Sequence, residues 1–373
     1  MSYNPFRYDI VGSYLRPQVL KQARDQFLQG QISEEELQKV EDQEILKLIA
    51  KQKSLGLKAV TDGEFRRSWW HLDFMWGFKG IRKTDLQTGY PFQGVETRKE
   101  TAQLEGKVEF DGTHPFLKHF TFLKEAVGEE LIPRQTIPAP SQLLSELQRP
   151  ENQPFIEKYY DSEEELAQDI ALAYQGFIQA IYDLGCRHLQ LDDCTWGMLS
   201  DKKFRDNVST HGVDLDQMAD TFSSINNKAI EKRPDDLQLT THVCRGNFRS
   251  TWAGSGGYDP IAPQLLGKEK VDAYYLEFDT DRAGDFTPLK ELTDNKHVVL
   301  GLVSSKIGEL EKKEEVIARI KEAAKIIPLD RLSLSTQCGF ASTEEGNVLS
   351  EEQQWNKISF VKEVAEEVWA EVN

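Results

Sequence analysis

Short apolar stretches recur along the chain, and they alternate with longer segments whose apolar residues follow the spacing of an amphipathic helix. The short stretches are rich in β-branched and aromatic residues and end in polar or turn residues, which is typical of buried parallel strands. Eight such stretches are predicted to be strands: 9–14, 58–65, 134–140, 188–193, 238–244, 273–278, 297–303 and 331–339.

The segments between these stretches carry helix start and stop signals. Serine followed three residues later by glutamate is a capping box, and it occurs at 33–36 and at 162–165. Gly56 and Gly185 stand where the C-terminal caps of these two helices are expected. Two further helices are predicted over 308–327 and 351–372.

Strand and helix alternating eight times predict parallel pairing with right-handed crossovers. We therefore predict an α/β fold, a (β/α)8 TIM barrel, as a single domain over 1–373. The connection 66–133 after the second strand is much longer than one helix requires. It contains three tryptophans, and its part 107–122 is expected to form a hairpin. We expect this insertion to be either a lid or a structural addition.

Composition and charge limit the classes of partner. The formal net charge of −17 disfavours nucleic acid and anionic membrane surfaces. No apolar run reaches the ~20 residues of a membrane span, and the first residues show neither a basic leader nor an apolar signal core. We therefore expect a cytoplasmic protein whose cysteines are free thiols.

The candidate chemistry depends on where the metal-binding residue types fall. In a (β/α)8 barrel the C-terminal ends of the strands meet at one mouth, where such barrels keep their catalytic groups. His242, Cys244, Glu277 and Cys338 stand at three of these ends. One imidazole, two thiolates and one carboxylate are a ligand set that zinc accepts in tetrahedral geometry. Each residue alone is more often a packed or hydrogen-bonding side chain, so their placement on one rim carries the prediction.

Other polar residues stand at the same mouth. Ser13, Glu64 and Asp192 end the first, second and fourth predicted strands. Cys186 follows a helix and Cys194 follows the fourth strand into a loop, so we expect both of these cysteines to be structural.

These motifs resemble those of cobalamin-independent methionine synthase. THVCRGN, YYLEFD and STQCGF are similar to the segments that hold its zinc ligands. VGSYLRP resembles its first-strand turn, TDGEF the segment with its substrate-binding acid, and QLDD its Asp-Glu pair. The resemblance covers nearly the whole chain but only the C-terminal catalytic barrel of that enzyme. It implies a single-barrel, zinc-dependent S-methyltransferase that moves a methyl group from 5-methyltetrahydrofolate to a thiol such as homocysteine, giving methionine.

The resemblance also implies a metal site with one zinc ion per chain. His242, Cys244 and Cys338 would hold the ion throughout, with Glu277 as the weakest ligand. The acceptor sulfur would either displace Glu277 or add beside it, and the sequence leaves both open.

Substrate contacts follow from the same resemblance. Ser13, Glu64 and Asp192 would hold the amino-acid part of the acceptor, because an ammonium group prefers carboxylates and a carboxylate prefers hydroxyl and backbone donors. An aromatic face suits a planar heterocycle, so we expect Trp70 either to stack on a flat pterin or to pack in the core, and Arg16 either to meet a glutamate tail of the donor or to be solvated.

One stretch departs from the family. The synthase has an aspartate and a histidine just after its seventh strand, and that histidine is suggested as the acid that protonates the folate nitrogen. Here the stretch reads GLVSSKIGE, and we name Lys306 as the catalytic candidate, because a buried lysine can give up a proton near neutral pH. A solvated lysine is the alternative. The departure leaves the donor open between methyl-folate, with or without polyglutamate, and methylcobalamin or a methylated corrinoid protein.

Two other functions compete with this one. A barrel of the uroporphyrinogen decarboxylase type works without metal and gives the histidine, cysteine and glutamate set no role. A non-catalytic zinc-binding barrel would more often hold its ion with closely spaced residues in loops. Ligands far apart in sequence on one barrel mouth favour an open, catalytic site.

Overall fold

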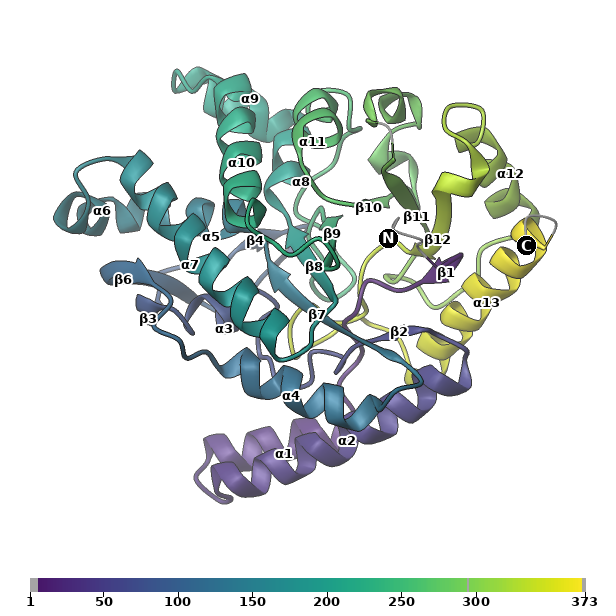
Figure 1. Cartoon of the computed structure of the whole chain (residues 1–373), viewed down its shortest axis with the longest axis horizontal. Helices are drawn as coiled ribbons and strands as arrows, with labels where there is room; N and C mark the ends of the chain where they lie inside the picture. Colours follow the sequence, from purple (N-terminus) through teal and green to yellow (C-terminus); the bar gives the residue numbers. More distant parts are fainter. Residues whose placement is uncertain (1–5, 294, 371–373) are drawn as a thin grey trace.

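The computed structural model describes residues 6–293 and 295–370, and it is a barrel of eight parallel strands surrounded by helices (Figure 1). The barrel strands are β1 (Tyr8–Asp9), β2 (Ala59–Val60), β7 (Ile132–Pro138), β8 (His188–Asp193), β9 (Gln238–Val243), β10 (Ala273–Glu277), β11 (His297–Val303) and β12 (Leu332–Thr336). Their order, β1-β12-β11-β10-β9-β8-β7-β2, is that of a TIM barrel. The predicted fold class is confirmed.

The barrel is nearly closed, with β1 and β2 at the two ends of the strand order. These two strands pair over only two residues each, much less than the predicted 9–14 and 58–65. Beyond them the chain turns into the barrel mouth, and the amide of Tyr14 donates to the carbonyl of Gly63 across the gap (3.1 Å). The other six strands lie close to their predicted positions.

The barrel helices mostly follow the predicted pattern. The helix over 34–54 begins with a complete capping box, whereas at 162–165 only the serine side of the box forms. Gly56 and Gly185 adopt positive φ after their helices, as C-terminal caps do. The helices are α1 (Gln18–Leu28), α2 (Glu34–Ser54), α5 (Pro140–Leu147), α6 (Gln153–Tyr159), α7 (Glu163–Asp183), α8 (Thr195–Ser200), α9 (Lys202–Thr210), α10 (Leu215–Ile230), α11 (Ala262–Lys268), α12 (Lys313–Ala323) and α13 (Glu351–Trp369), with 3-10 turns η1 (Pro150–Asn152), η2 (Asp281–Ala283), η3 (Thr287–Glu291) and η4 (Leu329–Arg331).

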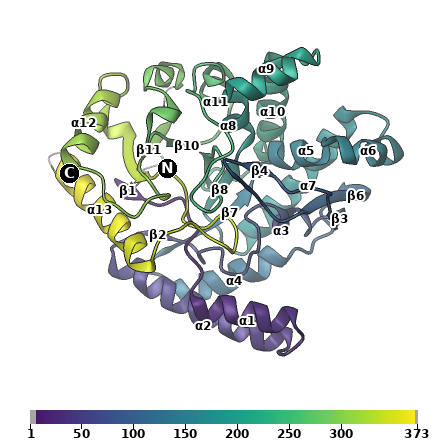
Figure 2. The same cartoon turned by 180° about the vertical axis from the view of Figure 1, so that it is seen from behind.

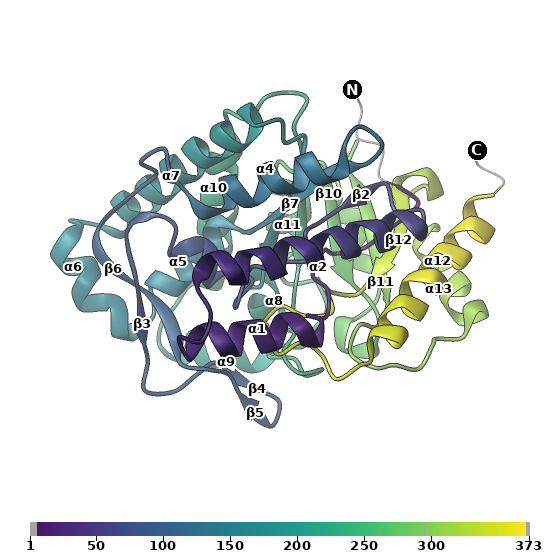
Figure 3. The same ribbon diagram turned by 90° about the horizontal axis from the view of Figure 1, so that it is seen from below.

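Helices α2 and α13 cover the side of the barrel where β1 and β2 meet (Figure 2). Their apolar faces supply Ile45, Leu48 and Ile358 to a cluster that includes Ile10 and Val60 next to the short strands. Helix α1, which was not among the predicted helices, lies antiparallel to α2 on the outside (Figure 3). No helix among the described residues is long and apolar enough to cross a membrane.

The long connection 66–133 has a different internal structure from the one expected. Its elements are α3 (Leu72–Met75), β3 (Lys79–Asp85), β4 (Pro91–Phe92), β5 (Val95–Glu96), β6 (Glu100–Glu109) and α4 (Pro115–Val127). The hairpin predicted over 107–122 is wrong, because β6 ends at Glu109 and α4 starts at Pro115 after the capping side chain of His114. The antiparallel pair is instead β3 with β6.

A buried polar cluster lies between β8 and the helices outside it. Asp193 accepts hydrogen bonds from the Ser141 hydroxyl (2.6 Å), the Thr195 amide (2.8 Å) and the Asn226 amide group (3.1 Å). The same Asn226 group donates to Glu269 (2.7 Å), which is 1% exposed. Burial, followed by the charge of Asp193, raises the pKa of Glu269 from 4.5 to about 8.

The raised pKa of Glu269 predicts how stability changes with pH. The folded protein keeps the Glu269 proton up to about pH 8 while the unfolded chain loses it near 4.5, so the stability contribution falls as pH rises between these values. Replacing Glu269 by Gln removes this ionisation. We expect Glu269→Gln to raise the melting temperature by a few degrees at about pH 9 and to give no gain at about pH 5.

The control is Glu309→Gln, at an exposed side chain, which should leave the pH profile of the melting temperature unchanged. Identical profiles for wild type and Glu269→Gln would contradict the assignment.

Candidate active site

A cavity of about 260 Å³ opens at the C-terminal mouth of the barrel. Its inner end is formed by residues at the strand ends, among them Ser13, Asp192 and His242. Its outer end is formed by aromatic residues of the 66–133 connection and by α5, with Trp70 and Glu146 as examples. The strands therefore supply the polar end and the insertion supplies the apolar end.

The four predicted metal ligands converge beside the inner end, which His242, Cys244 and Cys338 line. One ligand atom from each of His242, Cys244, Glu277 and Cys338 lies within 4.8 Å of all the others, and all four residues are buried. They come from β9, the loop directly after it, the last residue of β10 and the loop after β12. Two soft sulfurs, an imidazole nitrogen and a carboxylate at these separations fit a tetrahedral zinc ion.

One ring nitrogen of His242 is bonded to the backbone, and the other faces the cysteines. Its Nδ1 lies 3.2 Å from the carbonyl oxygen of Tyr275, and since a carbonyl can only accept, Nδ1 carries the proton. The lone pair is therefore on Nε2, which is buried and has no hydrogen-bond partner among the described residues. A histidine fixed by a backbone carbonyl on one nitrogen and open on the other is the usual arrangement of a metal-binding imidazole.

Three thiols meet beside this imidazole. The sulfurs of Cys244 and Cys338 are 3.7 Å apart, and the amide of Gly246 donates to the Cys244 sulfur (3.2 Å). The pKa of Cys244 is lowered well below its ordinary value, mainly by a hydrogen bond from the thiol of Cys194 and next by one from the thiol of Cys338. Cys244 is therefore the first of the three to become a thiolate, the form that binds metal.

Glu277 differs from the other three because protein donors already surround its carboxylate. Oε1 accepts from the Arg245 amide (3.1 Å) and from Gln337 Nε2 (3.3 Å), and Oε2 pairs with Arg282 (3.3 Å). Burial is the main cause that raises the pKa of Glu277. Its carboxylate is satisfied with or without a metal ion.

Glu64 lies in a strained turn at the inner end. It has φ +62°, a conformation that non-glycine residues rarely adopt, and it follows Gly63 with φ +70°. Oε1 pairs with Arg67 (3.2 Å) and accepts from the Thr136 hydroxyl (2.7 Å). Oε2 is buried and has no partner within the described part of the chain. The turn thus presents one free carboxylate oxygen to the cavity.

Ser13 is fixed against the loop that follows the Cys338 ligand. Its hydroxyl accepts from the amide of Ala341 (3.3 Å), and its carbonyl accepts from the amide of Phe340 (2.9 Å). A Cβ atom on Gly339 would lie 1.9 Å from the Ser13 hydroxyl oxygen. Only glycine at 339 allows this approach, so the Cys-Gly pair positions both the ligand and the serine.

The two aspartates of QLDD point to opposite sides of β8, as neighbours on a strand must. Asp192 lines the cavity, whereas Asp193 bonds the helices outside the barrel. Burial is the main cause that raises the pKa of Asp192 to about 7. Asp192 is thus the member of the pair that can meet a ligand.

The outer end of the cavity is an aromatic wall. Trp70 stacks on His71, with ring centroids 4.5 Å apart and planes at 28°, and Tyr90 and Phe92 continue the wall. Burial lowers the pKa of His71 to about 3, so this imidazole is neutral at physiological pH. Its Nδ1 has no partner among the residues described. Sequence reasoning missed His71; its position directly after the tryptophan pair was the available signal.

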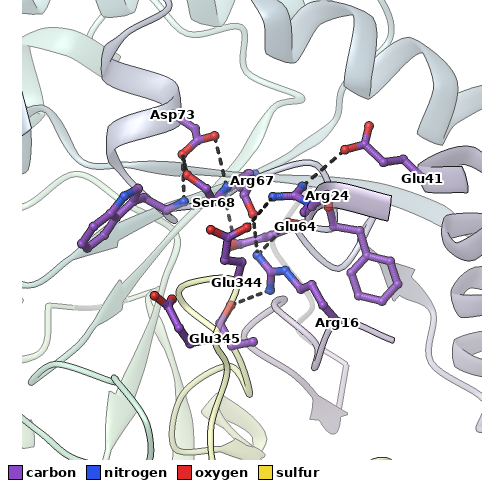
Figure 4. A network of polar contacts seen from close by, with 12 residues as sticks. Arg16, Arg24, Glu41, Glu64, Arg67, Ser68, Asp73, Glu344 and Glu345 are labelled. Atoms are coloured by element: carbon purple, nitrogen blue, oxygen red, sulfur yellow. Dashed lines mark hydrogen bonds and ion pairs between the residues drawn. The ribbon is translucent and has the colours of Figure 1, made fainter. Parts of the chain in front are cut away.

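Arg16 does not line the cavity. Its guanidinium is buried and donates to the carbonyls of Tyr14 (3.0 Å), Ala341 (2.7 Å) and Glu64 (2.7 Å). Figure 4 shows Arg16 and Arg67 on either side of Glu64, within a network that reaches Glu344. Arg16 thus holds the strand-end loops together, and its contact with a glutamate tail stays a prediction.

Lys306 lies just behind the cavity wall. Its Nζ donates to the carbonyl of Gly246 (3.2 Å) and to Asn247 Oδ1 (2.6 Å), and both of these residues line the cavity. Lys306 itself is not among the lining residues, and its role as proton donor stays a prediction.

The two cysteines expected to be structural behave differently. Cys186 is buried in the hydrophobic core and bonds the carbonyl of His188. Cys194 lines the cavity beside Cys244 and is therefore part of the site. The position of Cys194 in the cavity could not be predicted from the sequence. It depends on how α8 packs against the end of β9.

The chain is similar to proteins of one family over most of its length. The family model "Cobalamin-independent synthase, Catalytic domain" matches residues 152–358. The chain is 46% identical to the uncharacterized protein YxjH of Bacillus subtilis (strain 168) over 98% of this chain and 95% of YxjH. It is 21% identical to a methionine synthase of Sulfolobus acidocaldarius, covering 88% of this chain and 84% of that enzyme.

A solved structure is similar over the same extent. It is that of a Listeria monocytogenes protein described as a candidate vitamin-B12-independent methionine synthase, with TM-score 0.77, 39% identity and 98% coverage of both chains. Fold and family model together define a catalytic barrel of the cobalamin-independent synthase class. The chain belongs to the cobalamin-independent methionine synthase family. The uroporphyrinogen decarboxylase alternative is thereby set aside.

The converging ligands predict how zinc binding responds to mutation. Loss of a residue that only supports a metal ligand typically weakens metal binding by ~10–100-fold. Cys338→Ser removes one of the two sulfur ligands themselves, so we expect it to weaken zinc binding by at least this factor. Zinc affinity is measured by competition with a chromophoric chelator. Cys186→Ser, at a core cysteine outside the cavity, is the matched control and should retain about one zinc per chain. Equal zinc affinity in both variants would exclude Cys338 as a ligand.

Proposed function

We propose that the chain is a zinc-dependent S-methyltransferase that methylates a thiol of the homocysteine type, giving methionine or a close thioether. The observation that carries this proposal is the convergence of His242, Cys244, Glu277 and Cys338 at the inner end of a cavity that also presents Glu64 and Asp192. A bound zinc ion would keep the acceptor sulfur as a thiolate at neutral pH. Membership of the methionine synthase family supports the reaction class.

The inner end has groups for an amino-acid acceptor. The free oxygen of Glu64 and the carboxyl of Asp192 suit an ammonium group, and Ser13 suits a carboxylate. We propose that these three residues orient the acceptor so that its sulfur lies beside the cysteines. Burial of this end excludes water, which strengthens each of these contacts.

The outer end has groups for a planar methyl donor. We propose that Trp70 stacks on the ring system of 5-methyltetrahydrofolate or a related donor, since an aromatic face suits a flat heterocycle. The sulfur attacks the methyl carbon, the C–S bond forms, and the C–N bond breaks with its electron pair on nitrogen. That nitrogen needs a proton, and we propose Lys306 as its source. A lid role for 66–133 stays part of this proposal, because this connection supplies the aromatic wall.

A crossed methyl-transfer assay tests the function. L-homocysteine and simple thiols are combined with methyl-folate, as mono- and polyglutamate, and with methylcobalamin. We expect S-methylation of the amino-acid thiol with at least one donor and a loss of activity on zinc removal that added zinc restores. Full activity in zinc-free protein, or no transfer with any combination, would refute the proposal.

The role of Lys306 is tested by replacing it with methionine. If Lys306 protonates the leaving nitrogen, Lys306→Met lowers kcat with methyl-folate by about 100-fold or more, the usual range for a lost acid. Methylcobalamin needs no such proton, so transfer from it should change little. Equal losses with both donors, accompanied by weaker zinc binding, would show that Lys306 only holds the loop of Gly246 and Asn247.

A further inference from the structure

The carboxylate of Glu277 has a complete set of protein partners that do not include the other metal ligands. Three donors reach it: the Arg245 amide, Gln337 Nε2 and the guanidinium of Arg282. By contrast, the Nε2 atom of His242 has no partner among the described residues. Within the ligand set, the Glu277 oxygens thus have protein donors, whereas His242 Nε2 has none in the described part of the chain.

Arg282 is held rigidly for this contact. It belongs to the 3-10 turn η2, separated from the end of β10 by three residues, and its side chain is 9% exposed. Its guanidinium lies over the ring of Trp252, 4.8 Å from the centroid. One nitrogen bridges Glu277 and Asp279 at 3.3 Å each. A planar cation stacked on one side and paired at its edge keeps its position when one partner moves.

This arrangement determines what happens when Glu277 is not bound to metal. A buried carboxylate that leaves a metal ion without other donors would be an unpaired charge in a low-dielectric interior, which is strongly unfavourable. Glu277 is 0% exposed, so water cannot replace the lost contact. Arg282, Gln337 and the Arg245 amide supply the donors that water would otherwise provide.

We propose that Arg282 is a positioning residue that stays paired with the Glu277 carboxylate, so that this carboxylate keeps a partner when an acceptor thiol takes its place at the metal. This inference rests on the proposed function and concerns the role of Arg282. The sulfur arrives as a thiolate, its proton passes to the solvent, and the carboxylate keeps its negative charge opposite Arg282. His242, Cys244 and Cys338 remain in place.

The inference is tested with Arg282→Gln in zinc-loaded protein. We expect the dissociation constant for L-homocysteine to rise by at least about tenfold, the lower end for loss of a hydrogen bond to a charged group. Zinc in the thiol-free protein should bind as tightly as in wild type or more tightly, because Glu277 then has a stronger preference for the ion. A purely structural role of Arg282 would weaken zinc binding instead.

Zinc K-edge X-ray absorption gives a second readout. In wild type, homocysteine should replace one oxygen or nitrogen ligand by sulfur, and in Arg282→Gln this replacement should be incomplete at the same thiol concentration. Asp279→Asn is the complementary variant. Arg282 pairs with both Glu277 and Asp279, so this substitution leaves Glu277 as its carboxylate partner. It should bind the thiol a few-fold more tightly than wild type, and it keeps the test decisive if Arg282→Gln does not fold.

Arg319→Gln is the matched control. Arg319 also stacks on an aromatic ring, Phe286, and bonds the carbonyl of Phe278 (2.8 Å), but it makes no described contact with Glu277. It should bind zinc and thiol as wild type does. If wild type binds zinc and thiol and both Arg282→Gln and Asp279→Asn match it, this inference alone is overturned. If wild type binds no zinc, the proposed function fails with it.

Discussion

The candidate metal site holds thiols and a carboxylate so close together that they would repel each other if all were ionised and unpaired. Two like charges about 4 Å apart inside a protein repel by roughly 4 kcal/mol, and the sulfurs of Cys244 and Cys338 are 3.7 Å apart with Glu277 beside them. In the metal-free chain the thiols respond by sharing protons, which lowers the pKa of Cys244 and raises that of Cys338. A divalent cation would remove this repulsion, which is why the donor set and a zinc ion fit each other.

The barrel provides the rigidity that such crowding needs. The ligands stand on β9, β10 and the loop after β12, and the hydrogen bonds of parallel strands fix the spacing of the strand ends. Local strain adds to this: Glu64 adopts a positive φ, and Gly339 lies so close to Ser13 that no side chain fits. These features cost stability and are tolerated where the backbone must present a side chain to a ligand. The resulting cavity is polar and charged at the metal end and aromatic at the outer end.

The sequence predicted those features that follow from strand periodicity and barrel geometry. His242 and Cys244 are two residues apart at a strand end, so they share a face, and the barrel brings Glu277 and Cys338 to the same rim. The sequence did not predict features that depend on loop paths. Cys194 enters the cavity through the packing of α8, and the segment 107–122 splits into a strand and a helix. The sequence alone also cannot show that backbone carbonyls accept hydrogen bonds from the Arg16 guanidinium.

Anomalous X-ray diffraction at the zinc edge, from crystals of the chain grown with zinc, tests the central claim most directly. The account predicts one strong peak per chain within bonding distance of His242 Nε2 and the sulfurs of Cys244 and Cys338, with Glu277 facing it. An absent peak, or a peak that contacts none of these side chains, would contradict it.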